Sequence, residues 1–260
     1  MTGRAWVISK DSNDPIVATA IHAGHDLSPN ILPFVALDDA IRLREEDPFT
    51  DRWLPAAGNQ IRVVRSRFEV DLNRPRDKAV YLNADAAWGL NLWTAPLPSE
   101  VIAGSVASYD AFYHDLGALC DQIASVHPRF VVLDLHSYNH RRSGPDAAVD
   151  DPEENPEINV GTGSIDLSAW SDVVNAFSHT METTPFDGGH LDVRENVRFR
   201  GGHMSRWIND RYRGRGCAIA IEVKKFYMDE WTGQSDESVV ANVGDTLRAA
   251  SAALRDVLGS

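Results

Sequence analysis

The sequence has few cysteines and no long hydrophobic run. Its two cysteines, Cys120 and Cys217, fall in a predicted helix and a predicted strand, so we expect both to be small buried side chains rather than ligands or nucleophiles. No run of about 18 apolar residues occurs, which argues against a membrane-spanning helix. The first residues also lack the apolar stretch of a signal peptide. The sequence therefore predicts a soluble, cytoplasmic protein.

Positive charge is also scarce. The chain has 25 lysines and arginines against 38 acidic residues, a formal net charge of -13, and no basic arm. This balance disfavours a nucleic-acid partner. A hydrophobic fraction of 43% with 24% charged residues is ordinary for a globular protein. Because no repeat or linker divides the 260 residues, we expect one domain over residues 1–260.

Short β-rich runs alternate with amphipathic helices along the chain. This order predicts an α/β fold in which helices flank a central mixed, mostly parallel sheet. The predicted strands are residues 5–9, 16–21, 61–70, 130–135 and 218–223, and the predicted helices lie within 105–126 and 237–258. The run FVVLDL at 130–135 is apolar except for Asp134, as a strand buried on both faces should be. Residues 144–163 are acidic and rich in proline, asparagine and glycine, so we expect a long surface loop beside the active site.

Three histidines lie near the ends of predicted strands. His22 and His25 form an HAGH sequence just after one strand, and a turn there would let both imidazoles face one metal ion. Taken alone, such a pair is more often two unrelated histidines. His136 ends the predicted central strand, where ligands of α/β sheets gather. Asp134 either orients a ligand imidazole or is a buried aspartate paired with a helix N-terminus, and both interpretations remain open.

Two further groups of polar residues have a catalytic and a structural interpretation. Glu222 lies within the apolar run CAIAIEV, where a carboxylate acts as a general base beside a metal or forms a salt bridge. The segment 64–75 gathers arginines and Asn73 at the end of a strand. It would bind a carboxylate and a developing oxyanion, or form an ion-pair network.

The chain resembles the N-formylglutamate amidohydrolase family in five motifs that follow the family's order. They are HAG at 22–24, Arg67 with DLNR at 71–74, DLHS at 134–137, Asn196 with FRGG at 199–202, and IE at 221–222 with YM at 227–228. The family is similar in turn to the zinc carboxypeptidases and to the aspartoacylase and succinylglutamate desuccinylase group. The resemblance implies a zinc-peptidase-like (phosphorylase/hydrolase-like) fold, one zinc ion per chain, and hydrolysis of the amide bond of an acidic N-acylamino acid.

The resemblance also implies the metal ligands. His22 and His136 match two ligands of the family. The carboxypeptidase pattern has a glutamate three residues after the first histidine, where this chain has His25. We take His25 as the third ligand, because three histidines and a water also satisfy a catalytic zinc. A carboxylate from the acidic run at 45–51 is the alternative.

The remaining roles follow from the same motifs. Glu222 is implied as the general base, Arg67 as the group that polarises the scissile carbonyl, and Asn73 with Arg74 as the clamp on a substrate carboxylate. His203 and Tyr227 are further predicted substrate contacts. Two other functions remain open. One is a metallopeptidase or peptide amidase that acts on a larger substrate, and the other is a binding protein for a metal or a small acid without turnover.

Overall fold

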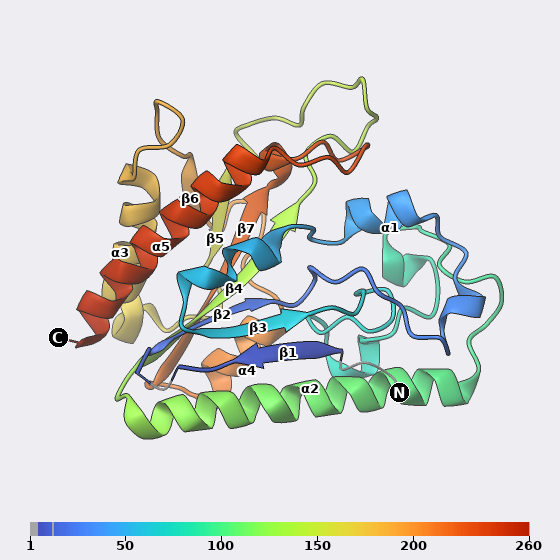
Figure 1. The fold of residues 1–260 in the computed structure, drawn as a ribbon, viewed down its shortest axis with the longest axis horizontal. Helices are drawn as coiled ribbons and strands as arrows, with labels where there is room; N and C mark the ends of the chain where they lie inside the picture. Colours follow the sequence, from blue (N-terminus) through green and yellow to red (C-terminus); the bar gives the residue numbers. More distant parts are fainter. Residues whose placement is uncertain (1–4, 12, 260) are drawn as a thin grey trace.

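The computed structural model describes residues 5–11 and 13–259, which fold around a seven-stranded mixed sheet (Figure 1). The strand order is β1-β3-β2-β4-β7-β5-β6. The strands are β1 Trp6–Ser9, β2 Ile16–Ala20, β3 Asn59–Val63, β4 Phe130–Tyr138, β5 Ile158–Gly161, β6 Val193–Glu195 and β7 Gly216–Lys224. β3, β2, β4 and β7 run parallel to one another, whereas β1 is antiparallel to β3 and β5 is antiparallel to β7. The prediction of a mixed, mostly parallel sheet in an α/β fold is confirmed.

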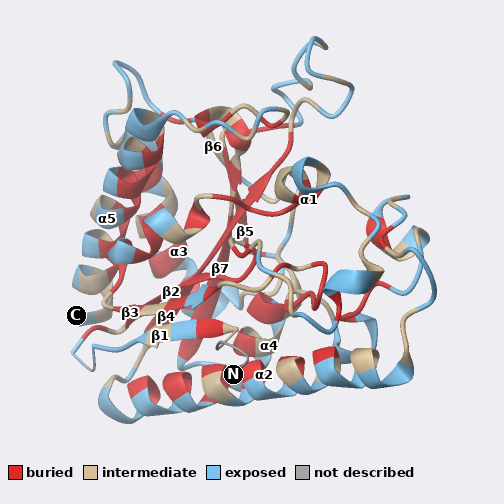
Figure 2. Ribbon diagram, turned by 45° about the vertical axis from the view of Figure 1, so that its right-hand side comes forward, coloured by how far each residue is buried: buried red, intermediate tan, exposed pale blue. Residues whose placement is uncertain are grey.

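Helices cover both faces of this sheet. The α-helices are α1 Asp39–Glu45, α2 Ser99–Val126, α3 Leu167–Thr183, α4 His203–Arg211 and α5 Glu237–Gly259. Short 3₁₀ helices lie at Leu32–Phe34, Thr50–Ala56, Arg76–Lys78, Asp85–Ala87 and Lys225–Tyr227. The side chains of α3 and α5 pack on one face, and those of α2 and α4 pack on the other. Figure 2 shows the buried strands as the centre of these layers.

The two central strands, β4 and β7, alternate between the two helix layers. On β4, Val131, Leu133 and Leu135 belong to the core under α3 and α5, whereas Phe130 and Val132 face α2 and α4. Because successive side chains of a strand point to opposite faces, Asp134 and His136 point to the same face as Phe130 and Val132. β2, β4 and β7 are parallel and end at the same edge of the sheet, so the polar residues at their ends converge there.

The sequence located the central strands well and the flanking ones poorly. The strand predicted at 61–70 ends at Val63, because the chain then turns, with Glu69 N donating to Ser66 O. The long loop predicted at 144–163 is wrong at its end, where Ile158–Gly161 forms the fully buried strand β5. The predicted helix at 105–126 begins earlier, at Ser99, directly after Pro98. Cys120 and Cys217 are both buried, as predicted.

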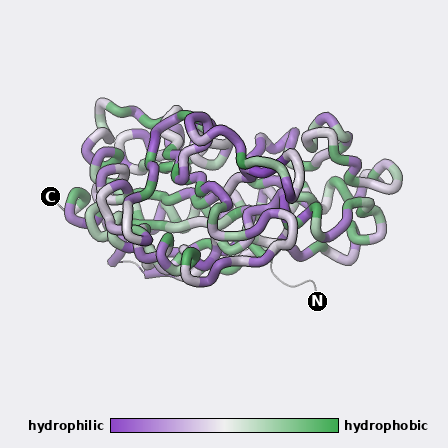
Figure 3. The backbone as a smooth tube through the Cα atoms, turned by 90° about the horizontal axis from the view of Figure 1, so that it is seen from above, coloured by the Kyte–Doolittle hydropathy of each residue, from purple (hydrophilic) through white to green (hydrophobic). Residues whose placement is uncertain are grey.

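A smaller core lies outside the main layers, in the segment that leads from β3 to α2. It consists of Phe68, Tyr81, Ala87 and Leu92, with Leu37, Ala86, Leu90 and Trp93 packed against it. Hydrophilic and hydrophobic stretches alternate along the chain (Figure 3). Within the described residues, no helix is both long enough and apolar enough to cross a membrane.

Candidate active site

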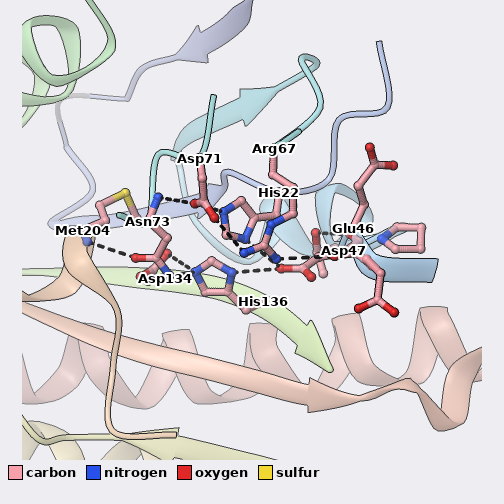
Figure 4. A network of polar contacts seen from close by, with 12 residues as sticks. His22, Glu46, Asp47, Arg67, Asp71, Asn73, Asp134, His136 and Met204 are labelled. Carbon is pink, nitrogen blue, oxygen red and sulfur yellow. Dashed lines mark hydrogen bonds and ion pairs between the residues drawn. The ribbon is translucent and has the colours of Figure 1, made fainter. Parts of the chain in front are cut away.

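Two histidines and an aspartate form a buried group at the carboxyl edge of the sheet (Figure 4). His22 follows β2, His136 lies in β4, and Asp47 follows α1. Each residue offers one ligand atom, and these three atoms lie within 4.8 Å of one another. Asp47 Oδ2 lies 2.9 Å from His136 Nδ1 and 3.4 Å from His22 Nδ1. Two imidazole nitrogens therefore face the same carboxylate oxygen.

The other nitrogen of each imidazole contacts a second carboxylate. His22 Nε2 lies 2.8 Å from Asp71 Oδ1, and His136 Nε2 lies 3.0 Å from Asp134 Oδ1. Metal-binding histidines are commonly held in this way, because the carboxylate fixes the tautomer and the ring orientation. His22 Nδ1 is buried and has no hydrogen-bond partner among the described residues. This orphaned nitrogen, together with the adjacent carboxylate and imidazole, fits a divalent metal ion such as zinc.

The charges of the group agree with this donor set. Burial opposes ionisation of Asp47, but the hydrogen bond from His136 and the nearby imidazole of His22 hold the pKa of its carboxyl below the usual range. Burial likewise opposes ionisation of Asp71, and Arg67 and His22 keep the pKa of Asp71 well below normal. Both carboxylates are therefore anionic at neutral pH.

His25 lies outside this group. Its Nδ1 is 2.6 Å from Glu46 Oε2, and its Nε2 is 3.0 Å from Arg42 Nη2. Both ring nitrogens therefore face α1 and the residue that follows it. The structure does not bring His25 together with His22 and His136, and the carboxylate of Asp47, from the acidic run, lies beside these two histidines instead.

Asp71 links His22 to Arg67. Its carboxylate accepts hydrogen bonds from Arg67 Nη2 at 2.9 Å and from the buried Tyr81 hydroxyl. Arg67 Nη1 also donates to Glu45 O at 3.4 Å. Arg67 is thus fixed in direction by two contacts, and it lines the pocket beside His22.

Asn73 and Arg74 differ in their access to the pocket. Asn73 lines it, with its Nδ2 3.3 Å from His136 Nε2, while its Oδ1 accepts a hydrogen bond from Met204 N. Arg74 does not line the pocket. Its guanidinium lies 4.4 Å from the Tyr81 ring centroid and 3.7 Å from Asp71 Oδ2.

Glu222 lies beside His136 on the adjacent strand. The two residues are direct register partners of β4 and β7, and both line the pocket. Burial raises the pKa of Glu222 to about 7, with His136 opposing this rise and Asp47 adding to it. A carboxylate that exchanges a proton near neutral pH is suited to general acid and base chemistry.

The pocket above these residues has a volume of about 360 Å³ and a cationic wall. Its basic residues are Arg67, Arg142, Arg198, Arg200 and Lys225. Arg142 pairs with Glu45 at 3.0 Å. Arg200 is exposed, and its side chain makes no hydrogen bond or ion pair with the described residues. Cationic groups therefore surround a site whose floor is acidic.

Two predicted substrate contacts do not line this pocket. His203 begins α4 and packs near the rings of Tyr109 and Tyr113. Tyr227 is fully buried and donates to Pro48 O at 2.9 Å, because its ring fills the core between Trp53 and Phe226. We therefore leave both residues out of the proposed substrate contacts.

Some pocket residues had no individual signal in the sequence. Asp47 stood only as one of several acidic residues in an alternative to His25. Arg142 lies next to the predicted acidic loop, and Trp88 lies in a segment without a recognisable motif. Each comes from a connection between regular elements, where spacing along the chain says little about position in space.

Fold and site together define an α/β protein with a buried His-Asp-His group at the carboxyl edge of its sheet. The model of the N-formylglutamate amidohydrolase family matches residues 14–228, and the chain belongs to this family. Its activity class is accordingly that of an amidohydrolase. A comparison with curated proteins finds no match.

The solved structures that resemble this chain are distant from it in sequence. The structure of N-formylglutamate amidohydrolase from Ralstonia eutropha JMP134 has a TM-score of 0.79 at 14% identity, over 98% of this chain and 99% of that one. A gene product from Agrobacterium tumefaciens has a TM-score of 0.65 at 15% identity, over 98% of this chain and 96% of that one. A metallo-carboxypeptidase from Burkholderia cenocepacia is matched at a TM-score of 0.40 and 14% identity, over 97% of this chain and 61% of that one.

Proposed function

We propose that this protein is a zinc-dependent amidohydrolase that cleaves the amide bond of an acidic N-acylamino acid of the N-formylglutamate type. The observation that carries the proposal is the pair of buried imidazoles whose Nδ1 atoms face Asp47, while their Nε2 atoms contact Asp71 and Asp134. His22, Asp47 and His136 would hold one zinc ion per chain. A zinc ion bound there would lower the pKa of a water molecule from about 15.7 to roughly 7 and supply a nucleophile at neutral pH.

The other residues then have separate tasks. Glu222 takes the proton of the attacking water and returns it to the leaving amine, because it lies beside His136 and has a pKa near neutrality. Arg67 faces the pocket and would stabilise the negative charge that develops on the acyl oxygen. Asn73 would donate to the carboxylate of the amino acid, and Arg74 would support that end of the pocket.

The charge of the pocket wall supports an acidic substrate. Arg142, Arg198 and Arg200 lie on the side of the pocket formed by the connections after β4 and β6. Guanidinium groups bind carboxylates in a bidentate manner, and Arg200 has no competing partner among the described residues. A volume of about 360 Å³ lies at the small end of the range for ligand pockets, which favours a single N-acylamino acid over a long peptide.

Metal content tests the ligand set directly. We expect about one zinc per chain in protein purified without a metal-binding tag, measured by elemental analysis. His136→Ala and Asp47→Ala should lose this zinc, because each removes a ligand. His25→Ala is the matched control, and it should keep the metal since its ring faces Glu46 and Arg42. Absence of metal from the wild-type protein after zinc is offered would overturn the proposal, and metal loss in His25→Ala alone would restore His25 as the ligand.

The role of Glu222 is tested by Glu222→Gln. This change removes the proton acceptor but keeps the size of the side chain, so zinc should remain bound while kcat for N-formylglutamate falls about 10²–10⁴-fold. Steady-state kinetics and metal analysis of the same preparation measure both. Near-normal turnover would show that another group is the base.

A further inference from the structure

Trp88 is an exposed aromatic residue on the wall of the proposed active-site pocket. It is 49% exposed although it is a large apolar side chain, and it lines the pocket together with Arg67 and Asn73. It directly follows the 3₁₀ helix Asp85–Ala87, in the segment between β3 and α2 that carries the smaller core. No role assigned above accounts for a tryptophan at this position.

The backbone holds Trp88 in an unusual conformation. Its φ is 53°, in the left-handed region, which costs a residue with a side chain about 1–2 kcal/mol relative to right-handed conformations. The turn around it is closed by hydrogen bonds from Gly89 N to Ala84 O and from Leu90 N to Ala87 O. Ala87 and Leu90 belong to the smaller core or pack against it. These contacts hold the backbone of Trp88 in a strained conformation, and such residues cluster at functional sites.

The indole lies over the two arginines that the proposed mechanism uses. Its ring centroid is 4.9 Å from Arg67 Cζ and 5.7 Å from Arg74 Cζ. The Tyr81 ring forms an edge-type aromatic pair with the same indole, at a centroid distance of 5.7 Å. Because Tyr81 also donates to Asp71, the ring is part of the structure that positions Arg67.

We propose that Trp88 sets the upper limit on the size of the acyl group that the enzyme accepts. This inference rests on the proposed function, in which Arg67 binds the acyl oxygen. An oxygen about 2.9 Å from a guanidinium nitrogen places the substituent of the acyl carbon in reach of a ring stacked on that guanidinium. A formyl group carries only a hydrogen at this position, whereas an acetyl or propionyl group carries carbon atoms that meet the indole.

The test compares acyl groups of increasing size in variants of this position. kcat/KM is measured for N-formyl-, N-acetyl- and N-propionylglutamate with Trp88→Ala, Trp88→Phe and Leu82→Ala. Leu82 is 57% exposed, lies in the same segment and does not line the pocket, so it controls for loss of stability. We expect the ratio of propionyl to formyl activity to rise at least about tenfold in Trp88→Ala, the scale set by one or two methylenes in a pocket. Trp88→Phe should be intermediate, and Leu82→Ala should keep the wild-type ratio.

Binding separates this inference from the proposed function. Calorimetry with Glu222→Gln gives the Kd of each acylglutamate without turnover. Adding Trp88→Ala should lower the ratio of the Kd for N-propionylglutamate to the Kd for N-formylglutamate by a similar factor. A ratio unchanged in both kinetics and binding overturns the role of Trp88 and leaves the proposed function intact. If the wild-type protein hydrolyses none of the three compounds, the proposed function fails, and the binding ratios still decide whether Trp88 limits acyl size.

Discussion

Lys225 shows how a single buried charge can shape the site without taking part in the reaction. Only 1% of the residue is exposed, and its Nζ donates to Arg44 O at 2.6 Å, to Glu46 O at 2.7 Å and to Asn139 Oδ1 at 2.8 Å. These bonds secure the end of α1, directly before Asp47. Lys225 is therefore a positioning residue for the proposed metal ligand.

We expect Lys225→Met to lower the free energy of unfolding by about 1–3 kcal/mol and to weaken zinc binding. The change leaves buried acceptors unpaired and frees the turn that carries Asp47. Urea unfolding and a zinc titration measure the two effects. Lys224→Met is the matched control, because Lys224 Nζ makes one hydrogen bond, to Asn155 O. Equal zinc affinities in the two variants would remove the positioning role.

The histidines illustrate what single residues reveal in the sequence. His22 follows an apolar strand and His136 lies near the end of another, so the sequence predicted that both lie at the carboxyl edge of the sheet. The choice between His25 and Asp47 was not, because it depends on α1. This helix brings Arg42 and Glu46 against the ring of His25 and turns Asp47 toward the other two histidines. Contacts of this kind form between segments that connect regular elements, and the spacing of residues along the chain does not predict them.

At the level of elements, the start of α4 lies against Asn73, which lines the pocket. Gly202 directly precedes α4, and a Cβ atom there would lie 2.1 Å from Asn73 Oδ1. The glycine thus allows the start of α4 to reach the amide that we assign to substrate binding. Gly202 is the second glycine of the FRGG motif, and this close approach to Asn73 explains why the motif has a glycine there.

Gly202→Ala should raise KM for N-formylglutamate and lower kcat/KM, because Asn73 must move away from the added methyl group. Steady-state kinetics give the effect. Gly104→Ala serves as the control, since Gly104 lies within α2 and its added Cβ meets nothing within 4 Å. That variant should keep its activity and gain about 0.5–1 kcal/mol of stability from helix propensity. Unchanged kinetics in Gly202→Ala would contradict the assigned role of Asn73.

The elements themselves were predictable where both faces of a strand are apolar. β4 and β7 stand out as continuous hydrophobic runs and were placed within a few residues. β5 and β6 have only four and three residues, and β5 follows a long acidic stretch. Strands this short show no recognisable alternation of apolar and polar residues. The structure of the connection from β3 to α2, which carries Trp88, could not be predicted either, because its small core is formed by residues far apart in the sequence.

On the scale of the whole molecule, the core under α3 and α5 contributes to stability from the side of the sheet away from the proposed ligand His136 and base Glu222. α3 and α5 pack on the face of the sheet opposite to His136 and Glu222. Leu247 of α5 is fully buried in that layer. Leu247→Ala should lower the free energy of unfolding by about 2–5 kcal/mol while kcat/KM of the folded protein stays unchanged. Denaturant unfolding and kinetics at low temperature measure both quantities, and a matching loss of activity in the folded state would show that the layers are coupled.

The direct pairing of His136 with Glu222 across β4 and β7 has a consequence for how the protein can diversify. An insertion of one residue in either strand would turn every following side chain to the opposite face, so the proposed ligand and base tolerate no change in strand length. Trp88 and Arg142 lie on connections, which accept insertions and exchange more readily. New acyl or amino-acid preferences can therefore arise by remodelling of these two connections, while the register of the sheet keeps His136 and Glu222 side by side.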